Sequence, residues 1–475
     1  MGMADDYAEH DGVGLAARVA RKEVTPAELV EAAIERIERH NGALNAVVYK
    51  AYDEARAAAK GDLPDGPFRG VPFLIKDLGV PVAGWPRTSG SRYMRDLVDG
   101  ADSTLAARYR ASGVVLLGKT NTPEFGITGT TESSRLGPCR NPWNRDHISG
   151  GSSGGAAASV AAGIVPLAHA SDGLGSIRIP AACCGLVGLK VTRDRNPSLP
   201  DANAYGNAVD HVVSRTVRDS AAMLDHTGVP IPGSAYPAPP KARPYVEEVG
   251  ASPGRLKIAF SGETPSGQVL DPEVVDALNA TADLLRRLGH DVEERGMGLD
   301  WRDFYRQTGR AGAANFAADI ARWIERLERE PEEDDFEPLT WASYKSGLKV
   351  TGAQAMQSMI DRRLWGRKIN EFFETCDVFL TPVMGMPAPQ VGWIDTVYLD
   401  PREVNRRQAQ AFPFTPPFNV SGQPSMSLPL AWSKSGLPIG MMFSGRYADE
   451  ATLFRLAGQL EKEAPWKDRR PPIWN

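Results

Sequence analysis

The sequence predicts an α/β fold, in which helices pack against a sheet of buried strands. One stretch shows the repeating unit of this class: an apolar strand at Leu256–Phe260, an amphipathic helix at Pro272–Leu288 that Gly289 ends, and a second strand at His290–Glu293. Short apolar runs elsewhere in the chain indicate further buried strands. These strands are expected at Val71–Ile75, Val114–Leu117, Ile164–Ala168, Val378–Leu380, Ser425–Leu428 and Ile439–Phe443.

Helices are expected on both sides of these strands in the chain. Thr25 is a good N-cap, Pro26 suits the first helical position, and Glu28 completes a capping box. Apolar residues then recur at helical spacing on one face, at Leu29, Ala33, Ile34 and Ile37. Residues 301–375 are expected to be mostly helical, and a last helix to cover Glu450–Glu461.

The charge balance argues against nucleic acid and anionic membranes as partners. The 475 residues include 54 Lys and Arg against 59 Asp and Glu, a net charge of −5, whereas those partners require a basic patch. The uncharged stretch Ile148–Ser171 has the length of a membrane span. Its glycines, its serines and Pro166 make it too polar for one.

The cysteines predict neither a metal site nor a disulfide framework. Cys139, Cys183, Cys184 and Cys376 lack metal-ligand spacing, and we expect buried thiols in a reducing compartment. The N-terminal residues lack the cationic and apolar regions of a signal peptide. We therefore expect a cytoplasmic protein.

The segment Gly113–Thr120 matches the phosphate-loop pattern letter for letter. That pattern requires a flexible loop that opens a helix. Here the interior positions are strand-forming, and Asn121-Thr122-Pro123 follows in place of a helix. Nucleotide binding is not expected.

The segment Gly151–Gly155 fits the G-x-S-x-G nucleophile elbow with Ser153 as nucleophile. An elbow serine stands directly after an apolar strand, and it needs an acid and a histidine downstream. The preceding residues do not form a strand, and His211, His226 and His290 have no suggestive context. We do not favour this interpretation.

The most informative block is Ser149–Lys190. A Gly/Ser-rich loop leads into an Ala-rich helix, a strand, and a second Gly/Ser loop that ends at Ser176. Glycine permits the close approach of two backbones and a substrate. Serines on two such loops, without a histidine, suggest nucleophilic catalysis with another base. Lys76 ends an apolar strand, where burial lowers the pKa of an amine enough for it to act as that base.

Several separated motifs, in the right order, make the chain resemble the amidase signature family. They are GVPFLIKDL, GKTNTPEFG, GGSSGG, SDGLGSIRIPAA, SRTVRDSA, FNVSGQPSMSLPL, GLPIGMMFSGR and DEATLF. The resemblance implies one large α/β domain over residues 1–475, with a central mixed, twisted sheet covered by helices on both faces. It further implies a catalytic core at about 65–230 and 376–465, and a helical substrate-pocket region at about 300–375.

The same resemblance implies a Ser–cisSer–Lys triad. Ser176 resembles the nucleophile, Ser152 the bridging serine after a cis peptide bond, and Lys76 the base. The resemblance implies an oxyanion hole formed by the backbone N–H groups of Gly173, Leu174, Gly175 and Ser176. Supporting residues are expected at Ser153, Asp172 and Arg178, with Arg178 forming an ion pair with an acid such as Asp172. No cofactor and no metal are implied.

Two departures from the family pattern concern the pocket. Leu174 stands where the family usually has glycine, so the loop must use ordinary dihedrals or carry strain. After Lys190, where the family tends to Lys-Pro-Thr, Arg193 and Arg195 either donate to a substrate carbonyl or are solvated.

The function implied is hydrolysis of small or oligomeric non-peptide amides. Within the family, the chain most resembles enzymes that cleave nylon oligomers, aryl amides or carbamates. A carbamate hydrolase with the same triad is an alternative, and the amidase subunit of a tRNA-dependent amidotransferase is another. Aromatic residues of the helical region and of Phe412–Phe418 either wall an apolar pocket or belong to the core. The expected partner is a small-molecule amide or carbamate, and the expected state is a monomer or homodimer.

Overall fold

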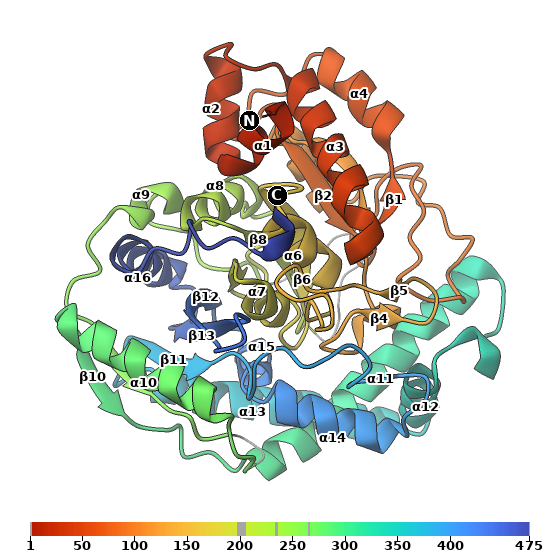
Figure 1. Cartoon of the computed structure of the whole chain (residues 1–475). Helices are drawn as coiled ribbons and strands as arrows, with labels where there is room; N and C mark the ends of the chain where they lie inside the picture. The colour runs from red at the N-terminus through yellow and green to blue at the C-terminus, as the bar shows by residue number, and fades with distance from the viewer. Residues whose placement is uncertain (1, 197–205, 233–235, 265–266, 475) are drawn as a thin grey trace.

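Strand β2 (Pro72–Lys76) lies beside strand β6 (Leu167–Asp172), and a sheet extends from each of them. The computed structural model describes residues 2–196, 206–232, 236–264 and 267–474 (Figure 1). The larger sheet has eight strands in the order β10-β9-β11-β13-β12-β7-β8-β6. Its other strands are β7 (Val187–Lys190), β8 (Val209–Ser214), β9 (Lys257–Phe260), β10 (Asp291–Glu294), β11 (Val378–Pro382), β12 (Ser425–Trp432) and β13 (Pro438–Gly445).

The larger sheet is mixed, as expected. Strands β9, β10 and β11 are parallel neighbours, and the pairs from β11 through β13, β12, β7 and β8 to β6 are antiparallel. The smaller sheet has the order β1-β3-β2, in which β2 is parallel to β3. Its other strands are β1 (Val47–Lys50) and β3 (Val115–Thr120), and a short hairpin pairs β4 (Glu132–Ser133) with β5 (Gly137–Pro138).

The helices surround these sheets. They are α1 (Met3–Glu9), α2 (Gly12–Ala20), α3 (Pro26–Leu44), α4 (Tyr52–Lys60), α5 (Thr104–Ala111), α6 (Gly154–Ala161), α7 (Arg178–Cys184), α8 (Val217–Thr227), α9 (Tyr245–Val249), α10 (Pro272–Arg287), α11 (Trp301–Leu327), α12 (Pro338–Gly347), α13 (Gly352–Phe372), α14 (Pro401–Ala411), α15 (Pro416–Ser421) and α16 (Glu450–Glu463). Short 3-10 turns form η1 (Glu124–Gly126), η2 (Glu333–Asp335) and η3 (Pro472–Trp474). In Figure 1, helices α1 to α4 gather at the top, α11 to α14 at the bottom, and α6 and α7 between them.

Helices cover both faces of the larger sheet. A side chain at Gly440 of β13 would meet Ala182 of α7 at 2.5 Å, whereas one at Gly445 would meet Leu453 of α16 at 3.3 Å. Positions five residues apart on a strand face opposite sides, because side chains alternate. Helices α7 and α16 therefore lie on opposite faces, which confirms the predicted layering.

The strands and helices inferred from the sequence are present, with small shifts at their ends. The capping box at Thr25 and Glu28 opens α3, and α10 starts at Pro272. Strand β6 begins at Leu167 instead of Ile164, after Pro166, which lacks the N–H that a ladder requires. Strands β1, β7 and β8 were not expected. The central mixed sheet is present, and a separate three-stranded sheet lies beside it where β2 meets β6.

The segment that matches the phosphate-loop pattern forms a strand, as its sequence indicated. It is strand β3, in which Lys119 is buried. All four cysteines are buried and free. No helix in the described part of the chain is long and apolar enough to cross a membrane.

Candidate active site

Lys76 is the last residue of β2, and its side chain is fully buried. Its Nζ lies 2.7 Å from Ser152 Oγ and 3.0 Å from Ser171 Oγ, and it donates a hydrogen bond to each. Burial lowers the pKa of Lys76 from its usual 10.5 to about 7, although the negative charges of Asp210 and Asp172 act in the opposite direction. Much of this lysine is therefore neutral near pH 7, and it can accept a proton.

Ser152 stands on a loop that glycines allow to pack tightly. The Gly151–Ser152 peptide bond is cis, as the family resemblance implies. A side chain at Gly151 would lie 2.4 Å from the carbonyl oxygen of Thr130. Gly126 of η1 has φ +67°, and a side chain there would lie 3.0 Å from Ser152 Oγ. Turn η1 and the serine loop meet at Ser152 only because both carry glycine.

Ser176 lies on the turn between β6 and α7, and it is half-buried. Ser153 joins this turn to the loop of Ser152, because its Oγ donates to the carbonyl of Ser171 at 3.2 Å and accepts the Ser171 N–H at 3.3 Å. Among the hydrogen bonds of the described residues, none joins Ser176 to Ser152. The fold thus brings Lys76 and Ser152 into direct contact and places Ser176 on a turn tied to their loop.

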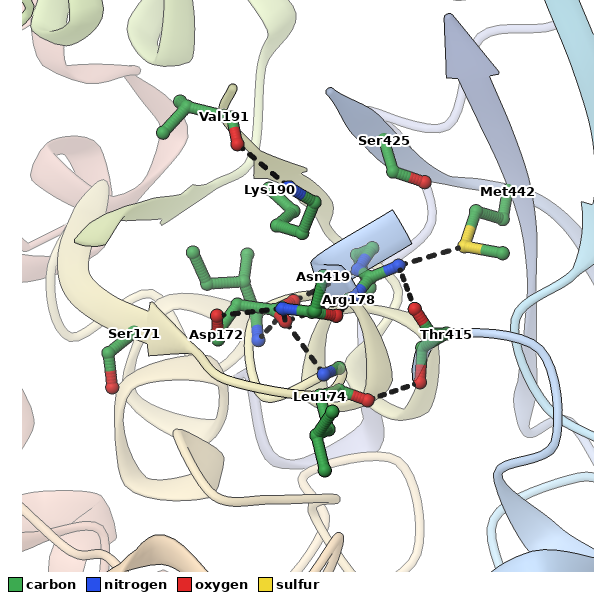
Figure 2. Close-up of polar contacts among 12 residues, drawn as sticks. Ser171, Asp172, Leu174, Arg178, Lys190, Val191, Thr415, Asn419, Ser425 and Met442 are labelled. Atoms are coloured by element: carbon green, nitrogen blue, oxygen red, sulfur yellow. Dashed lines mark hydrogen bonds and ion pairs between the residues drawn. The ribbon is translucent and has the colours of Figure 1, made fainter. Parts of the chain in front are cut away.

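Asp172 organises the turn that carries Ser176 (Figure 2). Arg178 donates to both carboxylate oxygens of Asp172, from Nε at 2.9 Å and from Nη2 at 3.0 Å. The backbone N–H groups of Gly175 and Ile177 donate to the same carboxylate at 2.7 and 3.2 Å. Burial would raise the pKa of Asp172, but Arg178 and a hydrogen bond from Asn419 lower it to about 2. The ion pair expected for Arg178 is present and fully buried.

The backbone N–H groups of this turn differ in what they contact. The Gly175 N–H is already used by Asp172. The N–H groups of Gly173, Leu174 and Ser176 donate no hydrogen bond to any described residue. They are therefore the donors that remain for an oxyanion, whereas Gly175 would first have to release the carboxylate.

Leu174 uses ordinary dihedrals, since it is not among the described residues with positive φ. Its carbonyl accepts a hydrogen bond from Thr415 Oγ1 at 2.6 Å. Its side chain is 53% exposed and points away from Asp172 and Arg178 in Figure 2. The leucine therefore adds an apolar group to the surface of the turn without straining its backbone.

Comparisons with known proteins show the family of this chain. The Amidase family model matches residues 28–454. The chain belongs to the amidase signature family. It is 38% identical to a 6-aminohexanoate-cyclic-dimer hydrolase of Paenarthrobacter ureafaciens, over 98% of this chain and 97% of that protein.

Two solved structures share the amidase signature fold with this chain. A 6-aminohexanoate cyclic dimer hydrolase complexed with substrate has a TM-score of 0.94 at 37% identity, with 98% of this chain and 100% of that chain covered. A bacterial aryl acylamidase of the family has a TM-score of 0.86 at 28% identity, with 96% of each chain covered. These relatives are named as hydrolases of amide bonds, and this chain is an amidase-family hydrolase.

In this amidase the helical region reaches the site through η1. The ring of Phe125, next to Gly126, packs edge-on against Phe316 of α11 and against Phe336. The neighbouring Glu124 is buried and accepts the backbone N–H of Glu337 at 2.7 Å. Phe316 and Phe336 thus belong to a packed cluster that reaches η1, one residue from the contact of Gly126 with Ser152.

The two arginines considered for substrate binding have protein partners instead. Arg193 donates to the carbonyl oxygens of Asn419 and Val420, both at 2.8 Å. Arg195 forms a buried ion pair with Glu450 at 3.0 Å. Neither is the solvated side chain that was the alternative. Their guanidinium groups are held by the protein itself, which removes the physical reason to assign them to substrate.

Sequence reasoning missed several residues around Lys76 and Asp172. Ser171, His169, Asp210, Asn419 and Thr415 each contact the site directly or through one bond. Ser171 and His169 lie two residues apart on β6. Because side chains alternate along a strand, this spacing predicts that both face the same side. Asn419 and Thr415 come from far along the chain, and no local pattern marks them.

No group of three or more His, Cys, Asp or Glu side chains in the described residues is arranged to hold a metal ion. A cavity of about 720 Å³ lies between the N-terminal helices and the C-terminal tail. Its lining includes Arg215, Trp466 and Trp474 and none of Lys76, Ser152 and Ser176.

Proposed function

We propose that this protein hydrolyses the C–N bond of small or oligomeric non-peptide amides with Ser176, Ser152 and Lys76. The observation that carries the proposal is the contact of a buried, largely neutral amine with Ser152 Oγ at 2.7 Å. An amine in this state can act as a base. The half-buried Ser176, on the turn ordered by Asp172, is the nucleophile of this proposal.

The proposed first step moves two protons along the triad. Ser176 Oγ attacks the amide carbonyl and gives its proton to Ser152, while Ser152 gives its own proton to Lys76. The carbonyl oxygen becomes an oxyanion, which the free N–H groups of Gly173, Leu174 and Ser176 stabilise. One such donor contributes about 2.7–4 kcal/mol in enzymes where it has been removed.

The second half of the reaction reverses this relay. The proton held by Lys76 returns through Ser152 to the leaving nitrogen, and the C–N bond breaks to leave an acyl group on Ser176. Water then attacks the acyl carbonyl, with Lys76 and Ser152 again taking the proton. The enzyme returns to its starting state with an acid and an amine as products.

The proposed substrate class rests on the relatives. One of them is named for the cyclic dimer of 6-aminohexanoate, and another for aryl acylamides. Both are small amides without peptide backbone, and the exposed Leu174 offers an apolar surface beside the proposed oxyanion site. A carbamate presents the same carbonyl to Ser176, so we include one in the test.

The test is a substrate panel run on the purified chain alone. It contains the 6-aminohexanoate cyclic dimer, an aryl anilide and an aryl carbamate. We expect turnover of at least one amide by the native protein, and losses of several orders of magnitude in Ser176→Ala and Lys76→Ala. Lys434→Ala is the control, because this lysine is exposed. A thermal melt of each variant checks its folding.

The other outcomes discriminate between the alternatives. Full turnover by Ser176→Ala would overturn the proposal. Turnover of the carbamate but of no amide would favour the urethane hydrolase. No turnover by the native chain alone, with glutamine hydrolysis appearing on addition of partner subunits, would favour the tRNA-dependent amidotransferase subunit.

A further inference from the structure

His169 connects the backbone of Lys76 to a carboxylate. The imidazole is fully buried on β6, and its Nδ1 accepts the backbone N–H of Lys76 at 3.2 Å. Its Nε2 lies 3.1 Å from Asp210 Oδ1. Since β2 and β6 are not paired in a hydrogen-bonded ladder, this side chain is a direct polar link between the two strands at the level of Lys76.

The hydrogen bonds determine the tautomer of His169. A ring nitrogen that accepts a backbone N–H carries no proton, so the proton of the neutral ring is on Nε2. That N–H then donates to Asp210. Burial lowers the pKa of His169, although Asp210 acts against this, so the ring stays neutral at neutral pH. The contacts therefore run from the backbone N–H of Lys76 through His169 to the carboxylate of Asp210.

Strand register places Asp210 on the same face as the lysine amine. Ser171 of β6 is directly opposite Asp210 of β8, and cross-strand partners present their side chains on the same face. Ser171 Oγ accepts a hydrogen bond from Lys76 Nζ at 3.0 Å. His169 is two residues before Ser171 and faces the same way. The three side chains therefore form one polar row beside Lys76.

The other ionisable groups near Lys76 are already balanced or neutral. Asp172 also favours the charged form of Lys76, but it is paired with Arg178 in the buried ion pair. Burial lowers the pKa of His211, the neighbour of Asp210, to about 3, so it is uncharged. Lys119 of β3 faces Asp77 at 3.7 Å. The remaining ionisable neighbour packed on His169 is the phenol of Tyr109, which burial keeps protonated.

We propose that His169 and Asp210 act as a positioning pair for Lys76, an inference that rests on the proposed role of Lys76 as the base. His169 holds the end of β2 so that the amine reaches Ser152. Asp210, linked through His169 and facing the amine, stabilises the ammonium that forms when Lys76 takes the proton. The Asp210 side chain is 18% exposed, whereas His169 between it and Lys76 is fully buried.

Three variants separate the two parts of this proposal. His169→Ala removes the acceptor for the Lys76 N–H. His169→Asn keeps an acceptor at nearly the position of Nδ1 but cannot reach Asp210. Asp210→Asn keeps the acceptor for His169 and removes only the charge. The matched control is His211→Asn, since this buried histidine neighbours Asp210 on β8 and bonds Ser220 instead.

The measurement is the pH dependence of kcat/KM for each variant, with a thermal melt to confirm folding. We expect Asp210→Asn to shift the acidic limb to lower pH by about one unit, because an opposite charge has been removed from the amine. We expect His169→Ala to lose about tenfold or more in kcat, and His169→Asn to recover much of that loss with an unshifted profile. His211→Asn should lower the melting temperature without moving the profile.

The result that would overturn the inference is an unshifted acidic limb in Asp210→Asn together with equal rates in the two His169 variants. Lys76→Ala is measured in the same series. If Lys76→Ala is inactive while the positioning variants behave like the native protein, only this inference fails. If Lys76→Ala remains active, the proposed function fails with it.

Discussion

The Nζ of Lys76 lies 2.7 Å from Ser152 Oγ, and the lysine side chain is fully buried. Burial lowers the pKa of Lys76 from 10.5 to about 7. The base is active in its neutral form, so its protonation below pH 7 removes activity. We expect kcat/KM to rise with pH through about 7 and to level off above it, measured on a neutral amide between pH 5 and 10.

An ordinary surface lysine would give a different profile. Its amine would still be losing protons near pH 10, and the rate would climb throughout the measured range. Such a climb, in protein that remains folded at each pH, would contradict the assignment of a low pKa to Lys76.

Ser152→Ala removes the group that is proposed to pass the proton of Ser176 to the Lys76 amine. Because proton transfer by a positioned group contributes about 10²–10⁴-fold, we expect a loss of that size in kcat with a smaller change in KM. Ser159→Ala is a matched control, since Ser159 is a buried serine of α6 whose Oγ donates to the carbonyl of Gly155. A Ser152→Ala enzyme with a kcat near that of the control would exclude the bridging role.

The sequence was sufficient to predict the layered fold and the contact between Lys76 and Ser152. Helix caps, apolar runs of strand length and motifs in a fixed order are local signals. The elements that they predict begin and end within a few residues of the observed ones. Strand β8 was missed because its apolar positions are interrupted by Asp210 and His211. The side chains of these polar residues contact His169 of β6 and Ser220 of α8, and local patterns do not encode such contacts.

The role of Arg193 and Arg195 could not be predicted for a similar reason. Both follow a family motif closely enough to suggest a position at the pocket. Their partners, Glu450 and the carbonyls of α15, lie more than 200 residues later in the chain. A position next to a motif in the sequence did not identify the partners of these arginines, because an arginine side chain is long enough to contact another element.

Asp172→Asn should destabilise the protein strongly. The change leaves Arg178 buried without its counter-charge, and breaking a buried pair in this way costs about 3–5 kcal/mol of unfolding free energy. Urea denaturation measures it. Glu371→Gln is the control, because it removes an exposed partner of Arg367, and it should leave the midpoint unchanged.

The contribution of the Asp172–Arg178 ion pair to stability is also expected to depend on pH. The carboxyl of Asp172 has a pKa near 2 in the folded protein and 3.8 when unfolded, so its contribution to stability is complete above about pH 4. It is lost as the pH falls toward 2. The difference in stability between the native protein and Asp172→Asn should therefore shrink over this interval, and a constant difference would contradict the low pKa.

Leu174→Gly tests the departure from the usual glycine. Leu174 is 53% exposed and has an ordinary φ, so its removal leaves no buried cavity and relieves no strain. We expect a small change in melting temperature and an altered ratio of kcat/KM between bulky and compact amides. Equal losses on all substrates, together with a large drop in melting temperature, would show instead that the leucine holds the turn.

Gly173 and Gly175, on either side of Leu174, differ in what a side chain would meet, and this gives a matched pair of variants. Gly175 has φ +137°, and a side chain there would lie 2.3 Å from Thr415 Oγ1, which is fixed by its bond to the carbonyl of Leu174. Gly173 has open space around the same position. Gly175→Ala must therefore rotate the peptide whose N–H bonds Asp172. This rotation displaces Ser176, the proposed nucleophile, and the oxyanion donors.

We expect a loss of kcat of at least about tenfold in Gly175→Ala, since the oxyanion donors act only when correctly placed, and near-native activity in Gly173→Ala. Similar rates for the two variants would show that the geometry of this turn does not limit the reaction.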